Sequence, residues 1–277
     1  MEKVQATASA QSSKETTVGN MPKTIDEVIA QLEALIDDCI KNNDRMGIFA
    51  ALYHKVTTRV KEGILNNEFE NGERMENLDV VFANRYLEAA ALWRTNKKPT
   101  NSWRVAFEAT KRSSPLIFQH LLLGINAHIN LDLGIATVES IDGANILNVR
   151  RDFNSINNIL ASLVFETLNE INRVSPLLSL FGLHANNGSI LIQFSITNAR
   201  DGAWSFAEDL SIKKGLEYDN CIKARDETIQ KLGLSLLHPK GLLRFTRWII
   251  HLFEWRKARK IIVAFYHSQK KYISFSK

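Results

Sequence analysis

Residues that break or cross-link a chain are scarce in this sequence. Its 277 residues include 2 cysteines, 5 prolines and 13 glycines. Cys39 and Cys221 are too few for the disulfide framework of a small secreted domain, so we expect two buried, reduced thiols. No linker rich in proline or glycine divides the chain. The sequence therefore predicts one domain that folds without disulfides.

Long hydrophobic runs are also missing. No stretch reaches the ~18–20 uninterrupted apolar residues of a membrane-spanning helix, and residues 1–20 lack the apolar segment of a signal peptide. Hydrophobic residues make up 45% of the chain and charged residues 23%, which is the balance of a globular protein. We therefore expect a cytoplasmic protein.

The common catalytic signatures are absent as well. The sequence has no P-loop, Gly-x-Gly-x-x-Gly turn, Gly-x-Ser-x-Gly elbow, His-Glu-x-x-His motif or Cys-x-x-Cys pair. It also lacks the paired Glu-x-x-His motifs of a ferritin-like di-iron site. These gaps argue against the common nucleotide-binding, hydrolase and di-iron classes.

What the sequence does contain is helical periodicity. Thr24-Ile-Asp-Glu27 has the spacing of a capping box, and apolar residues follow it at intervals of three and four. We predict an all-α fold, a single globular bundle of about ten helices around a buried central helix. It comprises residues 22–277 and follows a disordered tail at residues 1–21. The helices are predicted to begin at Thr24 and to span about residues 46–63, 77–95, 102–111, 115–134, 144–172, 190–213, 218–232 and 240–267, with a short helix after Ser175-Pro176.

The central helix, Pro115 to Gly134, is unusual because it is apolar nearly all round. It has no charged residue before Asp132. A helix of this kind is normally buried, so its polar side chains must find partners. At about 100° per residue, Gly124, His128 and Asp132 share one stripe. The remaining polar residues of interest are Asn126, Asn130 and His120.

Helical geometry separates those three residues from the stripe. Asn126 and Asn130 form their own pair four residues apart, roughly 160–200° away around the helix. His120 lies eight residues before His128, about 12 Å along the axis, which is too far for both to bind one metal ion. We therefore expect a two-residue site, His128 and Asp132, completed by side chains from other helices.

The motif from Leu121 to Gly134, Leu-Leu-Leu-Gly-Ile-Asn-Ala-His-Ile-Asn-Leu-Asp-Leu-Gly, resembles that of a family of uncharacterised, all-helical bacterial proteins known as a domain of unknown function. Weaker matching patches are Phe82-Ala-Asn-Arg-Tyr86, Asp152-Phe153, and Arg200 with Ala203-Trp204, so the resemblance spans about residues 24–260. The resemblance implies the fold and the location of the site, but no reaction.

The first functional hypothesis is an enzyme. His128 and Asp132 could bind a divalent metal ion, with Asp79, His54 or Asp152 completing the ligands. Without metal, Asp132 would orient His128 as a general base. Asn126 and Asn130 would then support the site or contact the substrate.

Two other hypotheses need no catalysis. Helical bundles form small-molecule pockets between facing side chains, and here such a pocket would have aromatic and basic walls. In the second alternative, the buried polar residues only lock the helices together. The candidate pocket residues are Arg85, Tyr86, Trp93, Trp103, His120, Asp152 and Trp204.

The C-terminal end is strongly basic. From Lys240 to Lys277 the chain has ten Lys and Arg residues against one acidic residue, Glu254. A basic amphipathic helix that contains tryptophan can lie on an anionic membrane. A packed terminal helix with its basic groups reaching solvent has the same pattern, and we favour that interpretation. Nucleic-acid binding is less favoured, because no known binding motif accompanies the charge.

Overall fold

The computed structural model describes residues 21–141, 143, 145–177, 185–239 and 241–273. All regular structure in these ranges is helical, which confirms the all-α prediction. The α-helices are α1 (Ile25–Asn42), α2 (Met46–Leu65), α3 (Gly72–Arg94), α4 (Asn101–Thr110), α5 (Ile117–Ala127), α6 (Leu133–Glu139), α7 (Arg150–Val174), α8 (Ala185–Ser211), α9 (Leu216–Leu237), α10 (Leu242–Phe253) and α11 (Ala258–Ile273). A π-helix, η1 (His128–Asp132), joins α5 to α6, and a 3-10 helix, η2 (Ile146–Val149), precedes α7.

Helix α1 begins close to where its capping residues predict. The Thr24 hydroxyl accepts a hydrogen bond from the Glu27 amide at 3.2 Å. The Glu27 carboxylate accepts from the Lys23 amide at 2.7 Å, one residue earlier than in a standard capping box. The helix ends at Asn43, whose φ of 54° is left-handed, a conformation that asparagine tolerates well. Local chemistry thus sets both ends of α1.

The central helix is longer than predicted. It starts at Ile117, because Leu116 remains extended and its amide bonds to the Gln119 side chain at 3.0 Å. It then continues through η1 to Glu139, five residues beyond the expected end. By length and composition, this stretch is the one helix among the described residues that could span a membrane, but 72% of its most apolar window is buried. That burial is typical of a core helix.

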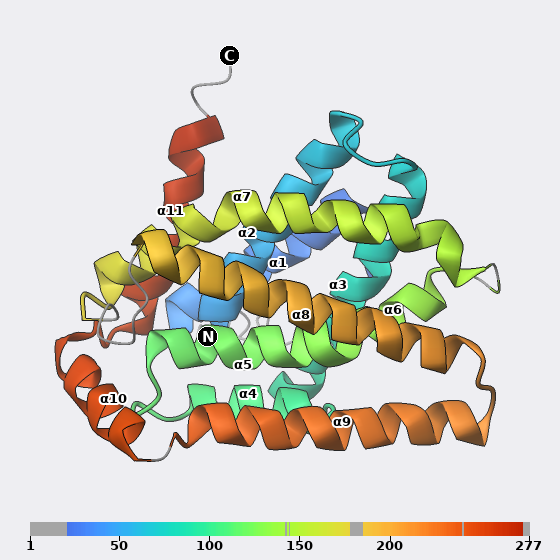
Figure 1. Ribbon diagram of the computed structural model, residues 1–277. Coiled ribbons are helices and arrows are strands. Elements are labelled where there is room, and N and C mark those ends of the chain that lie inside the picture. The colour runs from blue at the N-terminus through green and yellow to red at the C-terminus, as the bar shows by residue number, and fades with distance from the viewer. Residues whose placement is uncertain (1–20, 142, 144, 178–184, 240, 274–277) are drawn as a thin grey trace, which may run out of the picture.

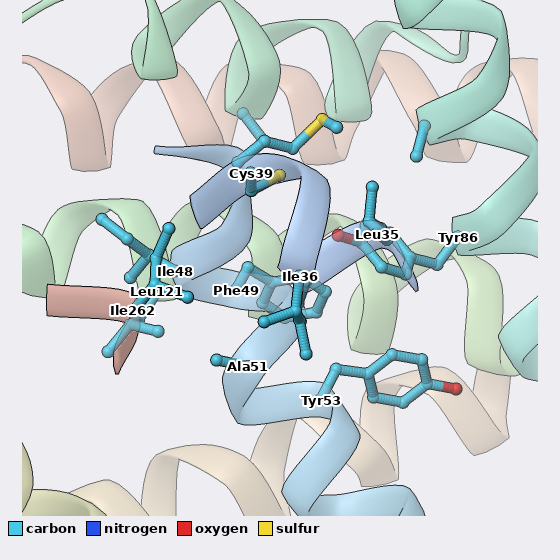
Figure 2. Packing of buried hydrophobic residues seen from close by; sticks show 14 of the residues in the cluster. Leu35, Ile36, Cys39, Ile48, Phe49, Ala51, Tyr53, Tyr86, Leu121 and Ile262 are labelled. Atoms are coloured by element: carbon cyan, nitrogen blue, oxygen red, sulfur yellow. The ribbon is translucent and has the colours of Figure 1, made fainter. Parts of the chain in front are cut away.

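Other helices surround the central one. In Figure 1, α5 lies between α8 and α9. It packs against α2, α4 and α9, and the η1–α6 part of the central helix packs against α3 and α8. The largest hydrophobic cluster joins α1, α2, α3, α5 and α11, and Figure 2 shows part of it around Phe49, Tyr53 and Tyr86. Helix α5 can approach α2 closely because Gly124 has no side chain: a Cβ there would lie 2.3 Å from the Phe49 ring.

The C-terminal segment differs from its prediction. We expected one helix over residues 240–267, but α10 and α11 are separate, with a break at Glu254. Tertiary hydrogen bonds explain the break: the Glu254 carboxylate accepts from the Ile117 amide at 3.1 Å, and the Trp255 amide donates to the Val174 carbonyl at 3.0 Å. These contacts hold the chain extended at a point where its local pattern would continue the helix.

Three smaller expectations have mixed outcomes. Cys39 is buried as predicted, but Cys221 is partly exposed, with its thiol 3.4 Å from the Asp209 carboxylate. Helix α3 begins at Gly72, five residues before the predicted start at residue 77. The short helix predicted after Ser175-Pro176 falls largely in 178–184, and the tail, apart from Met21, in 1–20, so both lie outside the described residues.

Candidate functional site

His128 and Asp132 occupy the two ends of the π-helix η1 in the middle of the bundle. The Leu133 amide bonds to the His128 carbonyl five residues back, which inserts an extra residue into the helical turn. His128 Nδ1 lies 3.6 Å from Asp132 Oδ2, and both side chains are buried. Gly124 and His128 both face Phe49 of α2, so the predicted stripe does share one side of the helix.

Two donors from other helices fix the Asp132 carboxylate. Trp103 of α4 donates its indole N–H to Oδ2 at 2.7 Å, and Arg85 of α3 donates Nε–H to Oδ1 at 3.3 Å. The Arg85 guanidinium also reaches Glu139 at 3.4 Å. Arg85 and Glu139 are partly exposed, whereas Asp132 is not, so this chain of polar contacts leads from the buried carboxylate to the surface.

The His128 ring is enclosed by aromatic side chains. Phe82 stacks on it with ring centroids 3.6 Å apart and an interplanar angle of 8°. Tyr53 meets it edge-on at 4.3 Å, and Phe49, Tyr86 and Trp103 stand slightly farther away. Neither ring nitrogen has a hydrogen-bond partner among the described residues. The imidazole is thus held in place by packing, with the carboxylate as its nearest polar neighbour.

Burial dominates the electrostatics of this site. It lowers the pKa of His128, and Arg85 lowers it further, whereas Asp132 acts in the opposite direction. The imidazole is therefore neutral near pH 7. Burial and the nearby charge of Asp79 raise the pKa of Tyr53 well above its ordinary value. Burial also raises the pKa of Asp79 itself to about 7, with a smaller contribution from Glu76.

His128 and Asp132 lie together, but no third predicted ligand joins them. Among the described residues, no group of three or more His, Cys, Asp or Glu side chains could hold a metal ion. Both Asp132 oxygens already accept hydrogen bonds, one of them from a cation. His54 instead lies 3.4 Å from Glu33, and Asp152 accepts from Arg74 at 2.6 Å. The residues present do not fit the metal centre that the sequence suggested.

Asn126 and Asn130 face away from His128, as their helical phase predicts. Asn126 donates to the Ile229 carbonyl of α9 at 3.0 Å and accepts from Asn130 at 3.1 Å. The Asn130 carbonyl accepts from Arg225 at 2.9 Å. These bonds join the central helix to α9, so the two amides are placed for structural support and not beside the imidazole.

His120 is separate from the His128 site. It lines a cavity of about 30 Å³, large enough for about one water molecule, together with Arg45, His251 and Glu254. Both of its ring nitrogens lack a hydrogen-bond partner among the described residues. Burial, and secondarily Arg45, lowers the pKa of His120 to about 4.

The aromatic residues of the pocket proposed from the sequence lie in three places. Tyr86 and Trp103 lie beside His128, but Trp204 packs against Phe153 with Arg150 over its ring. Trp93 packs on Phe107 and Lys111. His128 and Tyr86 do not line the small cavity of about 30 Å³ beside His120. They do not line the surface hollow between α1 and α11 either.

Four contributors to the site were not among the predicted site residues: Phe49, Tyr53, Phe82 and Glu139. A usable signal existed for the aromatic ones. Phe49 and Tyr53 on α2, like Phe82 and Tyr86 on α3, are four residues apart and so share a helix face. Nothing in the sequence indicated that both faces converge on one imidazole.

The comparisons with known proteins bear on family membership alone. Neither the curated proteins nor the solved structures gave a match. The sequence profile of a family of unknown function, DUF5995, matches residues 25–239, which include the whole central helix and every side chain around His128. Helices α10 and α11 follow the matched segment. The chain therefore belongs to the family of unknown function DUF5995.

Proposed function

We propose that the protein is an enzyme in which His128 transfers a proton and Asp132 orients its imidazole. The observation that carries this proposal is the state of His128: a neutral, buried base whose Nδ1 lies 3.6 Å from a fixed carboxylate and whose Nε2 has no hydrogen-bond partner in the described part of the chain. A buried polar group without a partner costs on the order of 1–3 kcal/mol. We attribute this cost, in the middle of the core, to a catalytic role of the imidazole.

The π-helix supports the same conclusion. An extra residue in a helical turn is less stable than regular α-helix, and π-bulges occur frequently at functional sites. Here the bulge coincides with the His128–Asp132 segment. Trp103 and Arg85 then hold the carboxylate in one orientation, which is the role that a carboxylate has beside a catalytic histidine.

Arg85 indicates the class of substrate. It is the cation nearest Asp132, it is partly exposed, and its bond to Glu139 at 3.4 Å is long and readily exchanged. An anionic small molecule could replace Glu139 on the guanidinium and so approach the aromatic enclosure of His128. Because the imidazole is almost completely covered, the enclosure must open for substrate, and α3 carries both Arg85 and Phe82.

The proposal is tested by asking whether the protein converts a metabolite. Purified protein is incubated with the small-molecule fraction of a cell extract, and mass spectrometry identifies any species that it consumes. For that species, we expect His128→Asn to lower the rate by roughly 100-fold or more, the usual contribution of a positioned acid–base group. Because burial lowers the pKa of His128, the wild-type rate should fall to half at a pH below 6.5.

Two variants serve as controls. His238→Asn changes an exposed histidine, and Asn126→Ala removes a buried amide on the opposite face of the helix. Both should retain activity, although the second should melt at a lower temperature. Equal conversion by wild type and His128→Asn, or no conversion by the wild type, would refute the proposal. In the latter case the polar core would be structural, and His128→Asn would change stability alone.

A further inference from the structure

Helix α10 presents an apolar face to solvent. Phe245 and Trp248 are each 57% exposed, Leu252 is 48% exposed and Phe253 is 61% exposed. At about 100° per residue, the first three lie within an arc of about 60°, and Phe253 lies about 80° beyond that arc, on the side of Phe245. Phe245 and Trp248 stack with their ring centroids 6.0 Å apart. The expectation that the C-terminal segment packs its apolar side into the core therefore fails for these residues of α10, although it holds for α11, whose Ile261, Ile262 and Phe265 are buried.

Contacts on the opposite side of α10 fix this orientation. Ile250 is buried, and Arg247 donates to the Leu237 carbonyl at 3.2 Å. The helix then ends at Glu254, whose carboxylate bonds to the Ile117 amide at the start of the central helix. In Figure 1, α10 lies at one end of the bundle. Because these anchors hold the inner side, the aromatic face stays directed outward.

The exposed charge of the α10 segment itself has one sign. Between residues 241 and 260 there are six Lys and Arg residues and a single acidic residue, Glu254. Glu254 is buried, whereas Arg244, Arg256 and Lys257 are exposed. No exposed carboxylate within this segment therefore offsets the positive charge beside the aromatic rings.

The exposed aromatic rings and the positive charge together indicate which partner binds this face of α10. A second copy of the chain would cover the apolar side chains but would bring two basic segments together. An anionic bilayer accepts both features, since aromatic rings enter the interface and Arg and Lys pair with lipid phosphates. We propose that α10 and the following residues to Lys260 are a docking site for an anionic membrane surface. The chain lies on the membrane through this site.

Vesicle binding tests this proposal directly. The full-length protein is mixed with vesicles of phosphatidylcholine alone or with about 30% phosphatidylglycerol, and the bound fraction is measured by flotation. We expect binding only to the anionic vesicles, with a blue shift of tryptophan fluorescence. Raising the salt from about 50 to about 500 mM should weaken it, because the phosphate contacts are screened.

Variants separate the apolar and charged contributions. The double change Phe245→Ser and Trp248→Ser, and separately Arg244→Gln with Arg256→Gln, should each lower the partition coefficient by roughly tenfold or more. Matched controls are Ile212→Ser with Leu216→Ser, which are both 79% exposed, and Lys223→Gln with Lys231→Gln on α9. These should bind like the wild type.

Three results would overturn the proposal. The first is equal binding by the α10 variants and the wild type. The second is absence of binding to anionic vesicles. The third is concentration-dependent dimerisation, measured by sedimentation, that the Phe245→Ser and Trp248→Ser change abolishes while vesicle binding is absent. Circular dichroism melting of each variant checks that the exposed substitutions leave the fold intact.

Discussion

His128 and His120 lie eight residues apart on the central helix, and burial makes both of them weak bases. Their surroundings nevertheless differ. His128 has a carboxylate at 3.6 Å and an aromatic enclosure, whereas His120 lines a small cavity beside Arg45. Asp79, one turn before Phe82 on α3, is another buried ionisable group, and one of its oxygens has no hydrogen-bond partner among the described residues. Each of these groups makes stability depend on pH.

The substitution His120→Leu should make the free energy of unfolding depend less on pH under acidic conditions. The unfolded state takes up a proton near pH 6.5, whereas His120 in the folded state stays neutral until about pH 4. The wild type therefore loses stability as the pH falls through this window, by up to about 3 kcal/mol at roughly 1.4 kcal/mol per pKa unit. Urea unfolding at pH 7 and pH 4.5 measures the loss. An equal loss in wild type and variant would contradict this assignment.

The substitution Asp79→Asn should have the opposite pH dependence. The pKa of Asp79 is raised from 3.8 to about 7 in the folded state, so ionising this carboxyl destabilises the fold as the pH rises through that window. We expect stabilisation on the order of 2–4 kcal/mol at pH 8 and clearly less at pH 5. Urea midpoints report both values, with the exposed Asp219→Asn as control. A gain independent of pH would refute the electrostatic origin.

At the scale of elements, the central helix depends on close approach to its neighbours. Gly124 lets α5 contact the Phe49 ring, and Gly134 lets α6 contact Phe206 on α8. On its other side, Asn126 bonds directly to the α9 backbone. The central helix is thus held by close packing at its glycines on some faces and by hydrogen bonds on another. These contacts explain how a nearly charge-free helix keeps one orientation in the core.

A pair of glycine variants tests this close packing. In Gly124→Ala the new Cβ would lie 2.3 Å from Phe49, so the helices must separate, and we expect a loss of about 1–3 kcal/mol. In Gly202→Ala, within α8, the nearest atom would be an Arg225 nitrogen at 3.7 Å. That change should stabilise by about 0.5–1 kcal/mol, because alanine is the better helix former. Thermal melts of equal midpoint for both variants would show that the contact is not limiting.

At the scale of the whole molecule, the last helix is part of the main core even though the family match ends before it. Ile261, Ile262 and Phe265 of α11 are buried in the largest hydrophobic cluster, and Figure 2 shows Ile262 beside Ile48 and Leu121. A Cβ on Gly47 would lie 2.6 Å from the Ile262 side chain, so α11 fits tightly against α2. Helix α10 is the exception, since it turns its apolar side outward.

Truncation after Pro239 should therefore destabilise the fold of the remaining residues. Removal of α11 uncovers apolar surface on α1 and α2, and each fully buried side chain lost costs about 1.5–3 kcal/mol. We expect a melting temperature lower by ten degrees or more, at roughly 2–4 °C per kcal/mol, and reduced solubility. Calorimetry of the truncated and full chains gives the comparison. A truncated chain that melts within about two degrees of the full chain would contradict this role.

The sequence by itself determined the helical class, the cap at Thr24, and the division of the central helix into a His128–Asp132 stripe and an Asn126–Asn130 stripe. Those features follow from local periodicity and side-chain chemistry, which are independent of the rest of the chain. Even the separation of His120 from His128 needed only the helical rise. Burial of the central helix followed from its near lack of charge.

Only the tertiary structure decided what each stripe contacts. Trp103 and Arg85 reach Asp132 from α4 and α3, the aromatic enclosure comes from α2 and α3, and Glu254 ends α10 by bonding to Ile117. Local pattern fixes which residues share a face, but the partner of that face depends on how distant helices pack. For the same reason, the sequence could not show that no third predicted ligand joins His128 and Asp132. It also could not show that α10 turns its apolar face outward, because this orientation depends on the contacts of its inner side.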